Sequence, residues 1–177
     1  MTTGYSVQIL ETTELTVSQK AILLAKCKGF MMIEHTELDV VILDLLISEI
    51  KKVERFTSHF LYVRKVQVSV LSVKGILDLP YVPAIKTLTP IFSDNQAVTW
   101  GSDNSLIANS SEPVSVTYSA GYSDIPEDIL YDIFETVRIF FDREDKLSLP
   151  DKIKAMTAYR EYAFENYRLN ALISSYV

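Results

Sequence analysis

A strand, a glycine turn and a proline-led helix follow one another between Val114 and Arg143, and this order constrains the fold more than any other part of the sequence. In the strand, small polar residues alternate with apolar ones, the period-two pattern of a strand with one buried face: Val114, Val116, Tyr118 and Ala120. Gly121 permits a sharp turn, and Pro126 suits the first turn of a helix, where its missing N–H would be unpaired anyway. The segment therefore predicts both a sheet and a helix.

A short helix is predicted from Val17 to Lys28 by the spacing of its apolar residues. Thr16 or Ser18 would open this helix, and Gly29 would stop it, because glycine is favoured just past a helix end. The lysines in its last turn complement the negative end of the helix dipole.

Two further helices are predicted on either side of the central part of the chain. Residues from Thr36 to Phe56 carry an apolar stripe at helical spacing, and Thr36 with Asp39 three positions later resembles a capping arrangement. Ser148 and Pro150 would open a last helix. Together with the helix behind Pro126, these segments make about four helices.

The pattern changes to a period of two after the second helix. Val66, Val68 and Val70 alternate with polar residues, and Pro80 and Pro83 interrupt the alternation. Further strands are expected over the ranges 84–92 and 97–100, and loops are expected over 101–105 and 109–113.

The predicted fold class is α+β, mainly helical with about four helices, and with a small antiparallel β-sheet or hairpin inserted between the second and third long helices. Residues 1–14 form an N-terminal arm or an added strand, 15–168 form one domain, and 169–177 form a C-terminal tail. A chain of 177 residues is long enough to bury a core as a single domain without disulfides.

The strand, the "YSAGY" turn, the "IPEDI" helix start and the aromatic residues before Arg143 resemble the C-terminal core of the bacteriophage head–tail connector (adaptor) family. The pairs Leu79–Pro80 and Pro83–Ala84 fit the same family upstream, as does the helix over 36–56. The order of the elements carries the resemblance, which extends over most of the chain. Residues 1–14 and 101–113 have no counterpart in it.

The resemblance implies a structural virion protein of the neck, not an enzyme, without a cofactor or metal. Such connectors form a ring, dodecameric in the expected case, that joins the portal of the DNA-filled head to later neck or tail proteins. The implied partners are the portal protein, neck stopper or tail proteins, and further copies of the chain; genomic DNA passes without sequence-specific binding, and no membrane is involved. The tail 169–177 is expected to become ordered on docking to the portal. A downstream neck stopper or tail-completion protein and a generic non-viral α+β binding module are the alternatives.

The net charge of −6 is concentrated in one block, because nine acids face three bases between Asp124 and Asp151. An acidic chain is a poor general binder of nucleic acid, whose phosphates are neutralised by Lys and Arg. An acidic ring lumen would instead repel passing DNA, whereas a solvated helix face is the alternative explanation. The candidate lumen charges are Asp124, Glu127, Asp128, Asp132, Glu135, Asp142, Glu144 and Asp145.

Tyrosine and arginine are enriched where proteins bury an interface, and the last helix carries both at several azimuths. Core packing and local ion pairs are the competing explanations. The candidates for ring contacts or portal docking are Tyr122, Arg138, Arg143, Tyr159, Arg160, Tyr162, Tyr167, Arg168 and Tyr176.

The sequence offers little for catalysis. Its two histidines, His35 and His59, match no metal-ligand spacing, and Cys27 lacks the local signature of an activated nucleophile. Its five glycines are scattered and form no phosphate-binding loop. A hydrolase using paired carboxylates would need a pocket that no local spacing indicates.

Overall fold

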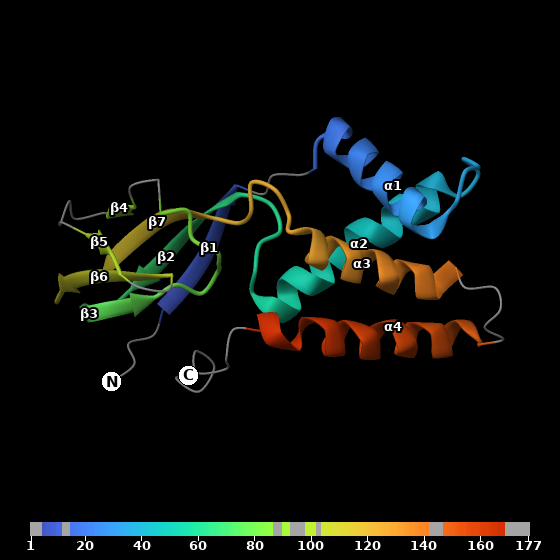
Figure 1. Cartoon of the computed structure of the whole chain (residues 1–177). Coiled ribbons are helices and arrows are strands. Elements are labelled where there is room, and N and C mark those ends of the chain that lie inside the picture. Colours follow the sequence, from blue (N-terminus) through green and yellow to red (C-terminus); the bar gives the residue numbers. More distant parts are fainter. Residues whose placement is uncertain are drawn as a thin grey trace. The chain divides into compact units, whose positions relative to one another are not determined.

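The computed structural model describes residues 5–11, 15–86, 90–92, 98–101, 104–141 and 147–168. The chain divides into two compact units (Figure 1). The β unit contains Ser58–Asp124 together with the first strand, and the helical unit contains Glu14–Thr57 and Ile125–Arg168. The extent of a single domain over 15–168 stays a prediction, and the tail 169–177 lies outside the described residues.

The helical unit consists of α1 (Val17–Met31), α2 (Asp39–Thr57), α3 (Glu127–Phe141), α4 (Leu149–Phe164) and a 3₁₀ turn, η1 (Glu165–Tyr167). The helices α2 and α3 pack against each other, and α1 and α4 each pack against both of them. Within this unit, α1 and α4 therefore flank the α2–α3 pair (Figure 1).

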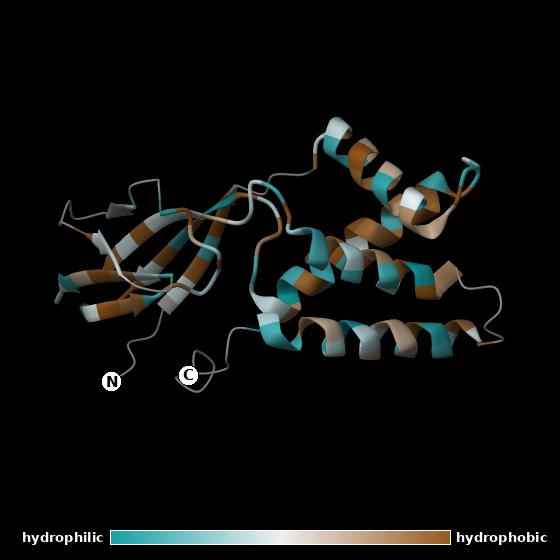
Figure 2. Ribbon diagram, viewed as in Figure 1, coloured by the Kyte–Doolittle hydropathy of each residue, from teal (hydrophilic) through white to brown (hydrophobic). Residues whose placement is uncertain are grey.

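The core of the helical unit comes from the apolar stripes of α2 and α3, with α4 more polar along its length (Figure 2). Ile42 and Leu46 of α2 are fully buried, as are Ile133 and Val137 of α3. Burying one such side chain contributes about 1.5–3 kcal/mol. The apolar residues of each stripe recur at i and i+4, so each helix has one continuous face in the core.

The β unit has two antiparallel sheets. The first has the order β1-β2-β7-β4, and the second has the order β3-β6-β5. Their strands are β1 (Tyr5–Glu11), β2 (Arg64–Val70), β3 (Val73–Asp78), β4 (Ile91–Phe92), β5 (Thr99–Trp100), β6 (Ser105–Ser110) and β7 (Val114–Ala120).

The strand β7 organises the core of the β unit. Its four apolar residues, beginning with Val114, are buried and alternate with partly exposed polar ones, so the predicted period of two is confirmed. Gly121 follows with φ of +123°, a left-handed value that glycine adopts without strain. A Cβ at this position would lie 2.6 Å from the carbonyl carbon of Tyr62, so the turn also needs glycine for space.

The predicted fold class is confirmed: four helices are accompanied by antiparallel strands that lie, except for β1, between α2 and α3. The strand β6 was not predicted, and the predicted loops at 101–105 and 109–113 are wrong where β6 includes Ser105, Asn109 and Ser110. Its partner β3 lies in the region before Pro80 where strand structure was expected. Polar residues occur in β6 because the Asn109 side chain accepts a hydrogen bond from the Gly75 N–H, at 3.0 Å. The expected strand over 84–92 is also wrong in part: of the described residues 84–86, Ala84 makes a single bridge and Lys86 lies in a turn.

Two predictions about helix ends are corrected. The helix α1 continues past Gly29 to Met31, and Met32 takes the left-handed capping position, with φ of 55°. The capping box lies at Thr16 and Gln19, not at Thr36, because Thr36 belongs to a turn and α2 begins at Asp39. The predicted Ser148 cap of α4 is confirmed by the hydrogen bond from the Asp151 N–H to the Ser148 hydroxyl.

Candidate functional site

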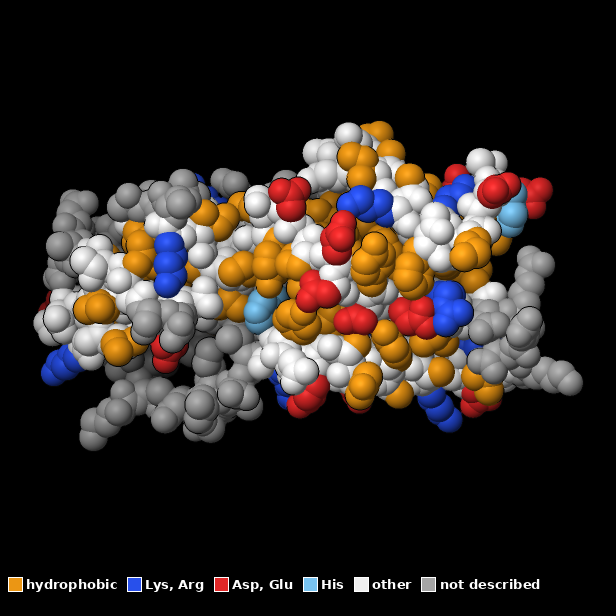
Figure 3. Space-filling view, in the orientation of Figure 1, with side chains coloured by type: hydrophobic (Ala, Val, Ile, Leu, Met, Phe, Trp, Pro, Cys, Tyr) orange, Lys and Arg blue, Asp and Glu red, His pale blue; other side chains and the backbone are white. Residues whose placement is uncertain are grey.

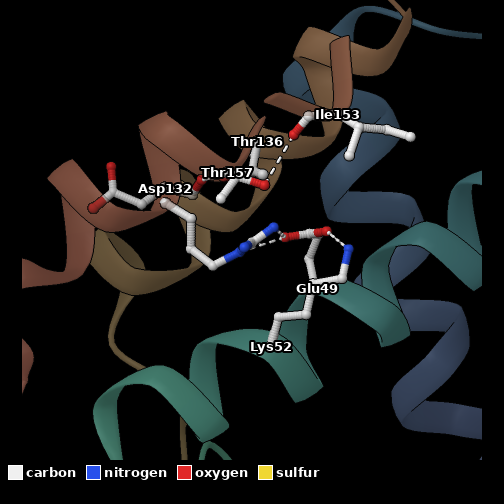
Figure 4. A network of polar contacts seen from close by, with 7 residues as sticks. Glu49, Lys52, Asp132, Thr136, Ile153 and Thr157 are labelled. Carbon is white, nitrogen blue, oxygen red and sulfur yellow. Dashed lines mark hydrogen bonds and ion pairs between the residues drawn. The ribbon is translucent and has the colours of Figure 1, made fainter. Parts of the chain in front are cut away.

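A buried carboxylate fixes α4 to α2 inside the helical unit (Figure 4). The Glu49 side chain has no exposed surface, and its Oε2 accepts hydrogen bonds from Nε and Nη2 of Arg160 at 2.9 and 2.8 Å. Its Oε1 is bound by the ammonium of Lys52 at 2.6 Å. Charged groups away from water need this kind of pairing, so Arg160 sets how α4 lies on α2.

Two tyrosines attach α4 and η1 to α3. The Tyr159 hydroxyl donates to Asp132 at 3.0 Å, and the Tyr167 hydroxyl donates to Asp128. The bond from Tyr167 lowers the pKa of Asp128, whereas burial raises the pKa of Asp132. Burial, followed by the contact with Asp132, raises the pKa of Tyr159 to about 12. The Tyr159 hydroxyl therefore stays protonated at neutral pH and can donate its hydrogen bond.

The remaining interface candidates differ in how exposed they are. Tyr162 is 82% exposed, whereas Tyr159 and Arg160 of the same helix are half-buried. Arg138 forms an ion pair with Glu135 on the surface of α3, and the guanidinium of Arg168 lies 5.3 Å from the centre of the Phe56 ring. The half-buried Tyr122 belongs to the β unit. Arg143 and Tyr176 lie outside the described residues.

The acidic candidates form a stripe on α3. Asp128, Asp132 and Glu135 recur at i, i+4 and i+7, the spacing of one helix face, and acidic side chains appear among apolar ones on the visible face of this unit (Figure 3). Glu127 and Asp124 are also exposed. Three further candidates lie outside the described residues: Asp142, Glu144 and Asp145. Whether the stripe faces a lumen stays a prediction.

A groove between α1 and α3 was not predicted. Its apolar wall is an aromatic cluster in which the Phe30 ring lies 5.8 Å from Tyr131 and 5.9 Å from Phe134. Lys26 and Glu127 bring charged groups to the same groove. The sequence did hold a signal, because α1 is apolar on most of its circumference, yet only two of its residues are buried. Such a helix leaves apolar surface for another contact.

The groups considered for catalysis lie in different surroundings. Cys27 is fully buried, and burial raises the pKa of its thiol to about 12, which disfavours the reactive thiolate. His35 is exposed near the start of α2, whereas His59 is half-buried in the β unit. Across the described ranges, no three His, Cys, Asp or Glu side chains are grouped to hold a metal ion. No helix within these ranges is long and apolar enough to cross a membrane.

Solved structures of gene transfer agent (GTA) particles contain chains that share this fold. One chain from the neck of an empty GTA particle, computed with C6 symmetry, matches with a TM-score of 0.62 and 15% identity, over 92% of this chain and 95% of that chain. A chain from the virion of a native gene transfer agent (GTA) particle matches at 0.55 and 13%, over 92% and 94%. A chain from the neck of a native GTA particle, computed with C12 symmetry, matches at 0.55 and 16%, over 91% and 94%.

No protein-family model and no curated protein matches the sequence. At identities of 13–16%, the three solved chains establish a shared fold. The agreement covers both units, because more than nine-tenths of this chain is included in each match.

Proposed function

We propose that this chain is a structural subunit of the neck of a phage-like particle, in which copies of it form a ring joining the portal to the tail and leaving a channel for DNA. The observation that carries this proposal is the fold shared with neck chains of GTA particles along nearly the whole length of both partners. The role requires binding surfaces and rigidity and no bond-breaking chemistry.

A closed ring of identical subunits needs two different, complementary faces on each subunit. The helical unit supports this requirement, because α1 and α4 flank its α2–α3 core. The charged residues of α1 are all lysines, whereas α4 exposes the acidic Glu161 next to Tyr162. The buried contact of Arg160 with Glu49 keeps α4 in a fixed position. A ring contact made on such helices keeps its geometry from copy to copy.

We also propose that the acidic stripe of α3 faces the channel. Duplex DNA carries one charge per ~1.7 Å, so a lumen lined with Asp128, Asp132 and Glu135 from every copy would discourage DNA from adhering. Replacing the three acids by Asn and Gln removes their charge, while the amide oxygens at 128 and 132 still accept the hydrogen bonds of Tyr167 and Tyr159. Ring assembly should therefore stay intact, and DNA release from particles should slow. Normal release from particles that carry the substituted ring would refute the lumen assignment.

The deciding experiment mixes the purified chain with the portal protein encoded by the same genome and images the particles by negative-stain electron microscopy. Added ring density at the narrow end of the portal supports the connector role, and averaging counts the copies. Bare portals beside folded, unbound chains would refute it. Deleting residues 169–177 in the same assay tests whether this tail contributes to portal docking; undiminished binding would refute that part.

A downstream neck ring is the second candidate, favoured by the C6 symmetry used for one of the matching particles. A stopper or tail-completion protein would bind a preformed connector in place of the portal itself. Adding the chain to portals with and without the preceding neck ring separates the two roles. Twelve copies bound directly to portals support the connector, whereas binding only after another ring supports the downstream role.

A further inference from the structure

The α1–α3 groove has the chemistry of a binding site for an aromatic side chain with a polar tip. It measures about 370 Å³, and its wall includes Phe30 and the half-exposed ring of Tyr131. Lys26 and Glu127 supply polar groups to the groove. At Gly29, also in the lining, nothing lies within 4 Å of the place where a Cβ would stand, so another chain can approach the helix backbone closely.

The solvent face of α4 carries a side chain of this kind. Tyr162 is 82% exposed, the most exposed aromatic residue described in the chain. Ala158, one turn earlier, is small and exposed, which leaves room for a second helix beside the tyrosine ring. Buried tyrosines that pair their hydroxyl with a polar group are common anchors of interfaces.

The two surfaces are complementary in charge. The helix α1 contains three lysines and no acidic residue, and Lys26 is exposed at the groove. Two exposed acids flank Tyr162 in the sequence, Glu161 in α4 and Glu165 at the start of η1. Opposite charges at the rim steer the two faces together and fix their register.

We propose that Tyr162 of one copy inserts into the α1–α3 groove of the next copy, with Glu161 of the first copy close to Lys26 of the second. The contact is heterologous, because α4 of each subunit meets α1 and α3 of another, so it generates a ring or an open chain of subunits. It deepens the proposed neck function by naming the contact between copies. The chain already pairs tyrosine hydroxyls with carboxylates at Asp128 and Asp132, which is the role Glu127 takes in the groove.

Cysteine cross-linking tests the pairing directly. Full-length proteins carrying Gly29→Cys or Ala158→Cys are mixed and oxidised, both bound to portals and concentrated without them. The native thiol of Cys27 does not interfere, because it is fully buried. The mixture should give a reducible dimer that neither variant gives alone. A protein with both substitutions should give a ladder of multimers, because a heterologous contact propagates.

Matched variants test the residues themselves. Tyr162→Ala should lower the yield of cross-linked dimer at least about tenfold. Ile153→Ala removes another half-exposed apolar residue of the same helix and should leave the yield unchanged. Lys26→Glu should weaken cross-linking, and a partner copy carrying Glu161→Lys should restore it.

Absence of the 29–158 product in both settings overturns the proposal, as does a yield unaffected by Tyr162→Ala. A dimer formed by Gly29→Cys alone would also overturn it, because α1 would then face its own copy. Electron microscopy of portal mixtures tests the neck function independently of the cross-link. If rings form on portals but the 29–158 cross-link does not form, the contact between Tyr162 and the groove is refuted and the neck function stands. If the cross-link forms but portals stay bare, the contact stands and the portal-binding role is refuted.

Discussion

Removal of the Arg160 guanidinium should destabilise the helical unit strongly. In Arg160→Met, the fully buried carboxylate of Glu49 loses two hydrogen bonds and keeps only the half-exposed Lys52. Breaking a buried ion pair costs about 3–5 kcal/mol, and the remaining lysine favours the lower end, about 3 kcal/mol. At ~4–8 °C per kcal/mol for a unit of this size, the midpoint of thermal unfolding should fall by roughly 12–24 °C.

The two units allow an internal comparison in this measurement. Far-UV circular dichroism follows the helices, whereas the only tryptophan of the sequence, Trp100, lies in the β unit and reports on that unit by fluorescence. Arg138→Met is the matched control, since the Arg138 side chain is half-exposed in its pair with Glu135, and surface pairs contribute about 0–1 kcal/mol. A loss in Arg160→Met no larger than in this control would refute the reasoning.

Three further predictions concern single positions. Gly121→Ala should destabilise the β unit by about 2 kcal/mol or more, because a Cβ would clash with the Tyr62 backbone at positive φ; an unchanged midpoint of tryptophan fluorescence in urea would contradict this. Thr16→Ala should cost about 1 kcal/mol through the lost capping box, measured by circular dichroism, with Thr16→Ser as the control that retains the cap. Tyr159 has a raised pKa in the folded state, so its contribution to stability is present below the ordinary value near 10 and is lost as pH rises through about 12. Tyr159→Phe should therefore lose less stability than the native chain between these pH values in urea titrations, and identical pH profiles would refute this assignment.

Local patterns predicted the elements whose sequence and environment agree. The strand β7 alternates apolar and polar residues and has one buried face, and α2 and α3 carry continuous apolar stripes that pack on each other. The strand β6 escaped prediction because Asn109 and Ser110 are typical of loops. In the structure, the Asn109 side chain binds the backbone of β3, a contact between residues far apart in the sequence. Pairing across such distances leaves no local periodicity to detect.

The residues of the candidate site were also only partly predictable from local sequence patterns. Tyrosine and arginine composition pointed to α4, but composition does not separate Arg160, which is paired inside the bundle, from Tyr162, which faces solvent. Whether a residue of α4 is paired inside the unit or exposed depends on its direction around the helix axis relative to α2 and α3. The groove depends on even more distant pairs, because Phe30 and Tyr131 meet only when α1 packs on α3.

The free energy of the buried ion pair between Glu49 and Arg160 indicates why charged residues occur inside the helical unit. Well-packed apolar residues often stabilise a core as well as a buried ion pair does, so stability alone does not require Glu49 and Arg160. Their bonds instead restrict the rotation of α4 about its own axis, which an apolar contact restricts less. Residues two apart on a helix differ in direction by about 200°. The rotation that turns Arg160 inward to Glu49 therefore turns Tyr162 outward, toward the groove that we propose as its binding site on the next copy.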